Sequence, residues 1–236
     1  MSGVERFPTW SISAVNLPEH ADNPVHTLEG GLAAGYDGAV VAGTTVFAYL
    51  TRPVAQAWGR PWVVGGGLEV WFRAPVLADE QVVVSGGPDA VNATVDDRRC
   101  ARLVPERVVE QPGEPAGDRL DPMVLVLDDR WSGYAARAGE DLSLYEAEAL
   151  VHPAVWPSLA NRVFATQLID GAWVHTRSRI RHLGAASPGD TVVIESWEVD
   201  RFESRSGERA VVDIRMSVDD RPVCAVEHEA IVRLAH

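Results

Sequence analysis

An apolar helix followed by a series of short strands is predicted twice along this chain, and this repeat most constrains the fold. The first helix is predicted over residues 43–58, where apolar side chains recur mostly at three- and four-residue steps. The second is predicted over residues 155–168. Pro53 lies inside the first helix and is expected to kink it or divide it in two, because proline has no amide hydrogen to donate.

One strand is predicted before each helix and several after it, because apolar and polar residues alternate there with a period of two. In the first half the predicted strands span residues 10–15, 68–72, 81–85, 90–95 and 100–104. In the second half they span residues 123–127, 173–181, 191–202, 210–218 and 222–234. Two segments echo each other between the halves: residues 67–75 resemble 174–181, and residues 77–80 resemble 187–190.

The order of helix and then antiparallel meander predicts an α+β fold in which each sheet wraps one helix. Since the order occurs twice, we expect two similar units whose sheets join into one continuous sheet. We place the N-terminal unit at residues 1–110 and the C-terminal unit at residues 123–236. Residues 111–122, within a stretch rich in Pro, Gly and Glu, are the expected linker.

The charge of the chain excludes some classes of partner. Its formal net charge is −13, and all 21 basic residues are arginine. Nucleic acid and anionic membranes are therefore not expected partners, since either needs a basic face. Without lysine, Schiff-base chemistry and a P-loop are excluded. Arg98, Arg99 and Arg102 could still hold the phosphates of a coenzyme A or phosphopantetheine carrier locally.

The remaining composition predicts a cytoplasmic protein without a metal or other cofactor. Cys100 and Cys224 lie in or beside apolar runs, as expected of buried thiols in a reducing compartment. Residues 1–8 contain no apolar core of signal-peptide length, and no apolar run is long enough to span a bilayer. No group of His, Cys and acidic residues has metal-ligand spacing.

The most informative local stretch is a polar loop with one histidine shortly before the first apolar helix. Asn23-Pro24-Val25-His26 forms the loop, and Gly43 opens the helix. A loop histidine can accept or give a proton near neutral pH. The first turn of a helix has unpaired N–H groups that can stabilise a carbonyl oxygen as it becomes negative. Taken alone, the loop fits an Asn-Pro turn with a surface histidine at least as well.

Three short motifs together carry a resemblance to a known family: Asn23-Pro24-Val25-His26, Ala33-Ala34-Gly35-Tyr36 and Val41-Ala42-Gly43-Thr44. In order and spacing they resemble the MaoC-like (R)-specific enoyl-thioester hydratases and dehydratases. The resemblance covers nearly the whole chain and implies a double hotdog fold with the active-site motif in the N-terminal half. It also implies a hydro-lyase that adds water to, or removes it from, a 2-enoyl thioester of coenzyme A or of acyl carrier protein.

The same resemblance implies a role for each site residue. His26 would activate the water that attacks C3 and return a proton to C2. Asp22 and Asn23 would position the water and the imidazole. Gly43 and Thr44, at the mouth of the helix, would bind the thioester oxygen.

Ala21 departs from the family pattern, because the hydratases usually carry a catalytic Asp five residues before the histidine. The nearest carboxylates are Asp22 and Glu19, and Asp22 would replace the missing Asp if the loop were shifted by one residue. Two alternatives remain open, of which the departure at Ala21 suggests the second. One is a hotdog acyl-thioesterase or another thioester-addition enzyme that uses the same helix mouth. The other is a non-catalytic subunit that binds acyl thioesters.

The second half has no Asn-Pro-x-His step, and residues 139–145 stand at the corresponding place. His152 is expected to pack or to cap its helix, and we expect structural or exposed roles for three further histidines, His175, His182 and His228. We therefore predict one working pocket per chain, with the second half giving room for a bulkier acyl group. The sequence leaves a homodimer open.

Overall fold

One antiparallel sheet of 11 strands runs through the computed structural model, which describes residues 6–169 and 171–235. Across the first half the strands follow the order β1 (Trp10–Ser13), β3 (Gln81–Gly87), β4 (Ala90–Val95), β5 (Arg98–Glu106) and β2 (Gly67–Phe72). The second half continues with β8 (Val174–His182), β11 (Arg221–Leu234), β10 (Gly207–Val218) and β9 (Thr191–Ser204). Two short strands, β6 (Asp118–Arg119) and β7 (Met123–Val126), both pair with β9.

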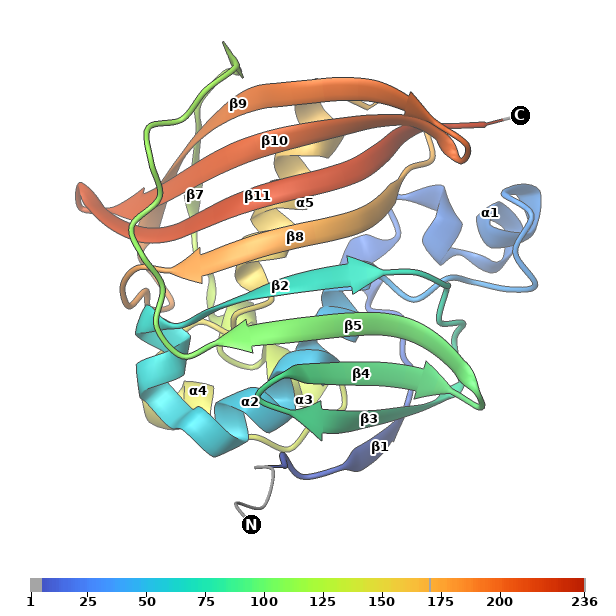
Figure 1. Cartoon of the computed structure of the whole chain (residues 1–236), viewed down its shortest axis with the longest axis horizontal. Coiled ribbons are helices and arrows are strands. Elements are labelled where there is room, and N and C mark those ends of the chain that lie inside the picture. The colour runs from blue at the N-terminus through green and yellow to red at the C-terminus, as the bar shows by residue number, and fades with distance from the viewer. Residues whose placement is uncertain (1–5, 170, 236) are drawn as a thin grey trace.

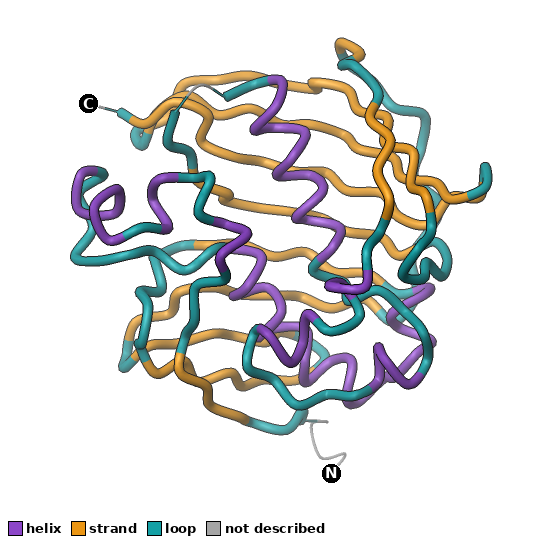
Figure 2. The backbone as a smooth tube through the Cα atoms, turned by 180° about the vertical axis from the view of Figure 1, so that it is seen from behind, coloured by secondary structure: helices purple, strands orange, loops and turns teal. Residues whose placement is uncertain are grey.

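Two long helices, α2 (Gly43–Gly65) and α5 (Val155–Gln167), cross the same face of this sheet, one in each half. Figure 1 shows the sheet in front of them, and Figure 2 shows the helices from behind. Short helices fill the loops before them: α1 (Leu28–Ala33), α3 (Tyr134–Arg137), α4 (Leu144–Ala147) and the 3₁₀ turns η1 (Pro18–His20), η2 (Pro24–His26) and η3 (Asp129–Trp131). The predicted double hotdog is therefore confirmed.

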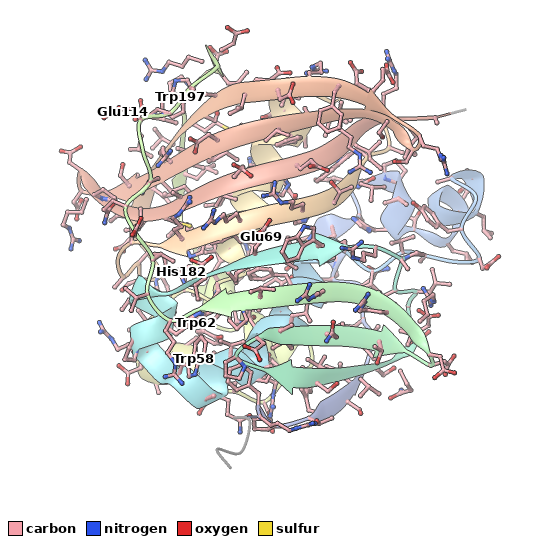
Figure 3. The ribbon with its side chains drawn as sticks, in the orientation of Figure 1. Trp58, Trp62, Glu69, Glu114, His182 and Trp197 are labelled. Carbon is pink, nitrogen blue, oxygen red and sulfur yellow. The ribbon has the colours of Figure 1, made fainter. Side chains whose placement is uncertain are left out.

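The two halves meet where β2 pairs with β8. Gly67 pairs with Arg181 at one end of this ladder, and Trp71 pairs with Arg177 at the other. On the outer face, Arg177 donates to Glu69 at 2.6 Å and to Glu227 at 2.8 Å. Figure 3 shows Glu69 on this face, in the middle of the sheet.

The predicted echo between residues 77–80 and 187–190 is visible as the same hydrogen bond in each half. The Leu77 amide donates to Glu80 Oε2 at 2.7 Å, and the Ser187 amide donates to Asp190 Oδ2 at 2.8 Å. Each acid closes the turn that leads into the next strand, β3 or β9. The repeat therefore extends from the element order to individual side chains.

The break in the first long helix lies at Gly59 and not at Pro53, where the sequence predicted it. Gly59 has φ 61° and ψ −158°, a conformation that glycine adopts readily. Pro61 follows two residues later and has no amide hydrogen for an intrahelical bond. The helical segment after Gly59 extends α2 to Gly65, well past the predicted end at residue 58.

The expected linker, residues 111–122, includes β6, whose two residues pair with Glu198 and Trp197 of β9. The connection from β5 to β7 thus adds a short strand to the edge of the second half. No helix within residues 6–169 and 171–235 is both long enough and apolar enough to cross a membrane.

The central helix is expected to carry much of the stability of the first half. Leu50 on α2 is fully buried, so Leu50→Ala should lower the free energy of unfolding by about 2–5 kcal/mol through lost burial and a residual cavity. Leu32→Ala is the matched control, because Leu32 is 54% exposed and its loss should change the free energy by less than about 0.5 kcal/mol. Urea denaturation checks both values. Equal midpoints for the two variants would contradict this packing.

Candidate active site

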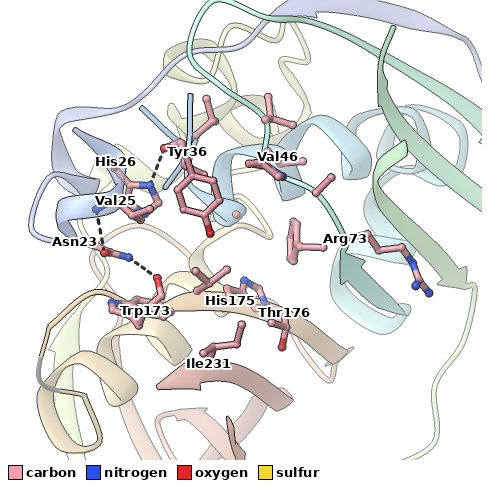
Figure 4. Close-up of a pocket in the computed structure, with 18 of the residues that line it drawn as sticks. Asn23, Val25, His26, Tyr36, Val46, Arg73, Trp173, His175, Thr176 and Ile231 are labelled. Atoms are coloured by element: carbon pink, nitrogen blue, oxygen red, sulfur yellow. Dashed lines mark hydrogen bonds between the residues drawn. The ribbon is translucent and has the colours of Figure 1, made fainter. Parts of the chain in front are cut away.

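A cavity of about 270 Å³ opens at the N-terminus of α2, between the two halves (Figure 4). The first half lines it with Asn23, Val25, His26, Tyr36, Val40, Val41, Gly43, Val46 and residues 72–76. The second half contributes Asn161, residues 173–176, Ser206, Arg209 and Ile231. The predicted loop and helix mouth are therefore brought together, and the second half forms the opposite wall.

Both polar atoms of the Asn23 side-chain amide hold the loop in place. Its Oδ1 accepts a hydrogen bond from the Val25 amide at 3.4 Å, which caps the 3₁₀ turn η2. Its Nδ2 donates to the Trp173 carbonyl of the second half at 3.1 Å. The side chain thus holds the His26 loop against the opposite wall of the cavity, and both of its polar atoms are used by protein groups.

His26 lines the cavity with one ring nitrogen already engaged. Its Nδ1 lies 2.8 Å from the Val40 carbonyl oxygen, so Nδ1 carries the hydrogen and donates it. The lone pair of the neutral ring is then on Nε2, the nitrogen with no protein partner in the described chain. Burial lowers the pKa of His26 from its ordinary value of 6.5, and the bond to Val40 opposes this shift. The imidazole is therefore neutral at pH 7, as a general base must be.

Gly43 is the first residue of α2 and also lines the cavity. Ala42 supplies no side-chain cap, and the first backbone bonds of the helix are donated by Thr45 and Val46 to the Ala42 carbonyl. Within the described chain, the amides of Gly43 and Thr44 have no acceptor, so this helix end can hold a developing negative charge.

Thr44 and Asp22 do not line the cavity. Thr44 is fully buried, and its Oγ1 contacts His20 Nε2 at 3.3 Å. Asp22 is exposed. Neither the Thr44 hydroxyl nor the Asp22 carboxylate is thus placed to reach a ligand there, and no Asp or Glu is found among the described lining residues.

Two polar residues of the cavity were not selected from the sequence. Figure 4 shows the Tyr36 hydroxyl pointing into the cavity, and burial raises the pKa of this phenol. His175, expected to be structural or exposed, lines the cavity and is 6% exposed. A histidine in the middle of an alternating strand pattern gives no signal of its own, because the register with the other half decides what it faces.

The arginines of the site also differ from those singled out in the sequence. Arg98, Arg99 and Arg102 do not line the cavity, and Arg98 pairs with Glu80 at 2.8 Å. Arg73 and Arg209 do line it, and they also line a groove on the outer side of the sheet with Trp71, Phe72, Thr176, Arg177 and Glu229. Arg209 pairs with Glu229 at 2.6 Å, whereas exposed Arg73 has no acidic partner among the described residues.

The place in the second half that corresponds to the cavity is filled by side chains. Phe72, the last residue of β2, lines the cavity, whereas His182, the last residue of β8, packs against Trp62 with 5.2 Å between ring centroids. Figure 3 shows Trp62 and His182 side by side. The break at Gly59 brings Trp62 to this position. The second half thus uses the equivalent space as core.

His152 stands before α5 and was expected to pack or cap. Its Nδ1 accepts from the Ala154 amide at 2.9 Å, and its Nε2 lies 3.3 Å from Glu140 Oε1, with both side chains fully buried. That expectation is confirmed. In the described part of the chain, no three His, Cys, Asp or Glu side chains cluster closely enough to hold a metal ion.

Comparison with known proteins supports the fold. No family model and no curated protein sequence matches this chain. A double hotdog protein of Mycobacterium tuberculosis has a TM-score of 0.64 and 12% identity, covering 97% of this chain and 96% of its own. A protein of Chloroflexus aurantiacus assigned as a MaoC domain dehydratase has a TM-score of 0.65 and 11% identity, with 98% and 95% covered.

A protein of Lactobacillus plantarum assigned as an oleoyl thioesterase has a TM-score of 0.55 and 12% identity, covering 100% of this chain and 99% of its own. These likenesses establish the double hotdog fold, which proteins assigned as dehydratases and as thioesterases share.

The buried histidines predict a protein whose stability falls in mild acid. Burial lowers the pKa of His20 and His182 to about 4 and that of His175 to about 3, from an ordinary 6.5. Between the lowered pKa of each ring and the ordinary value of 6.5, the unfolded chain binds more protons than the folded chain. This stabilisation is therefore complete above about pH 6.5 and is lost as the pH falls towards 4. Urea midpoints should stay constant from pH 7.5 to about 6.5 and should then decrease towards pH 5.0. A constant midpoint over this range would contradict the burial of these rings.

Proposed function

We propose that this chain is a hydro-lyase that adds water to, or removes it from, a 2-enoyl thioester. The observation that carries the proposal is that His26 and the N-terminus of α2 share one cavity, with His26 Nδ1 held by the Val40 carbonyl. A neutral imidazole base and an oxyanion site on one cavity are the two groups that this addition requires.

The proposed reaction moves one proton through His26. Nε2 takes a proton from water as the oxygen attacks C3, and the electron pair of the C2–C3 double bond shifts toward the thioester carbonyl. The Gly43 amide stabilises the resulting enolate oxygen. Protonated His26 then returns the proton to C2, which restores the thioester and the neutral imidazole. In the reverse direction the same steps remove water.

Three neighbours support His26 without exchanging its proton. Asn23 bridges the loop to Trp173, and Val40 fixes the tautomer, so both act as positioning residues. Tyr36 directs its hydroxyl into the cavity and is the polar group proposed to hold the water. Asp22 has no role in this scheme, because it is exposed and outside the cavity.

Arg73 is the proposed contact for the carrier of the thioester. It lies where the cavity meets the outer groove, and Figure 4 shows its side chain extending away from the other lining residues. Arginine without an acidic partner favours a phosphate group. A pantetheine chain that enters here would place its phosphate on Arg73 and its thioester near Gly43. Coenzyme A and phosphopantetheine share this chemistry.

A thioesterase is the second candidate, and a specific observation favours it. The cavity lacks the carboxylate of the hydratase pattern, since no Asp or Glu is among its described lining residues. Water activated by His26 would then attack the carbonyl carbon and release the thiol. Crotonyl-CoA and butyryl-CoA distinguish the two reactions. Loss of enoyl absorbance without free thiol supports the hydro-lyase, whereas thiol release from butyryl-CoA supports the thioesterase.

His26→Ala should lower kcat for crotonyl-CoA hydration at least about a hundredfold, because it removes the general base. KM should change much less, since the carrier and acyl chain bind through other residues. Asp22→Asn is the matched loop control and should keep nearly full activity, because this side chain is exposed. Steady-state kinetics of the three proteins test this. Full activity of His26→Ala, or a large loss in Asp22→Asn, would contradict the assignment.

A further inference from the structure

His175 is a buried imidazole of the second half that lines the cavity formed with the first half. It is the second residue of β8, and Trp173 and Val174, the two residues before it, also line the cavity. Its ring lies 4.6 Å from that of Phe72, between ring centroids. Its Nδ1 is buried and has no hydrogen-bond partner in the described chain. The proposed base does not account for this unpartnered nitrogen.

The nitrogen lies directly against the helix mouth. A Cβ placed on Gly43 would come 3.2 Å from His175 Nδ1, so the imidazole nitrogen and the first residue of α2 are in contact range. The Gly43 amide is one of the unpaired donors of this helix end. One ligand oxygen at this point can therefore meet a backbone donor from the first half and a ring nitrogen from the second.

A hydrogen-bond chain couples the position of the His175 hydrogen to that of the His228 hydrogen. His175 Nε2 lies 2.8 Å from Ser178 Oγ, and Ser178 Oγ lies 2.8 Å from His228 Nδ1. The two imidazoles also stack, with 4.1 Å between centroids. Since the single hydroxyl hydrogen of Ser178 serves one ring, the other ring must donate to its oxygen.

One order of this chain puts its unpaired N–H on a residue that lines the cavity. If His228 Nδ1–H donates to Ser178 and the Ser178 hydroxyl donates to His175 Nε2, the hydrogen of His175 is on Nδ1, beside Gly43. The reverse order would put a hydrogen on His228 Nε2, which is buried without a partner. Each order leaves one buried N–H without a protein acceptor, but of the two histidines only His175 lines the cavity, where a ligand oxygen can accept the hydrogen bond. A bound ligand therefore favours the first order.

We propose that His175, supplied by the second half, is a second hydrogen-bond donor to the thioester oxygen, beside the Gly43 amide. The inference rests on the thioester site proposed above. The ring acts as a neutral donor, and burial, which lowers its pKa to about 3, keeps it neutral at pH 7. It gives up no proton. Ser178 and His228 are positioning residues that hold the donating tautomer.

Three variants separate donation from packing. His175→Leu removes the donor and should lower kcat for crotonyl-CoA hydration about a hundredfold, the low end for a lost oxyanion donor. His175→Asn keeps an N–H at the place of Nδ1 and should stay within about tenfold of the native kcat. His182→Leu is the matched control on the same strand, because His182 is equally buried and does not line the cavity, so its kcat should not change.

A spectroscopic readout makes the test independent of turnover. Butyryl-CoA labelled with ¹³C at the carbonyl should show a lowered carbonyl stretch in difference infrared spectra when bound to the native protein, since hydrogen bonds polarise this bond. The shift should be smaller with His175→Leu and should persist with His175→Asn and His182→Leu. An equal shift in native protein and His175→Leu would overturn the proposal.

The two proposals fail separately. Absence of hydration in the native protein, together with a His175-dependent carbonyl shift, would refute the hydro-lyase and keep the donor. Normal hydration with an unchanged shift in His175→Leu would do the opposite. If His175→Leu does not fold, Ser178→Ala decides, because loss of the hydroxyl frees the tautomer. That variant should then show a reduced shift, and a native shift would overturn the proposal.

Discussion

The backbone pairing of β2 with β8 is the constraint on which the rest of the molecule depends. It joins the five strands of the first half and the six of the second half into one sheet, and it ends at Trp71 and Arg177. Beyond that end β2 and β8 are no longer paired, and residues 72–76 and 173–176 line the cavity. The mouth of α2 faces this opening. The ladder that joins the two halves of the sheet therefore ends at the cavity.

The two ends of this ladder differ in what surrounds them. At one end Phe72, His175 and the first residue of α2 surround a cavity, whereas at the other Trp62 and His182 form part of the core. The glycine at position 59 allows α2 to turn and continue, which brings Trp62 to that end. One half thus supplies the proposed base and the N-terminus of α2. The other half supplies the opposite wall and the proposed second donor.

Much of the fold followed from local patterns. The strand over residues 90–95 and the stop of α1 at Gly35, with its φ of 85°, needed only alternation and glycine chemistry. The helix break was placed wrongly, because a proline in a helix was a stronger signal than a glycine near its predicted end. Only part of the candidate site could be predicted from the sequence. His26 and Gly43 stand in recognisable steps, but the place of His175 depends on a strand register between residues far apart in the chain.

The central claim is that the two halves build one thioester cavity per chain. Isothermal titration calorimetry with S-butyl coenzyme A, an inert thioether, measures the number of binding sites most directly, because this ligand cannot be hydrated or hydrolysed. The account predicts one binding site per chain, with affinity reduced in Arg73→Ala at the cavity mouth and unchanged in Arg98→Ala outside it. Two equivalent sites per chain, or equal losses in both variants, would contradict it.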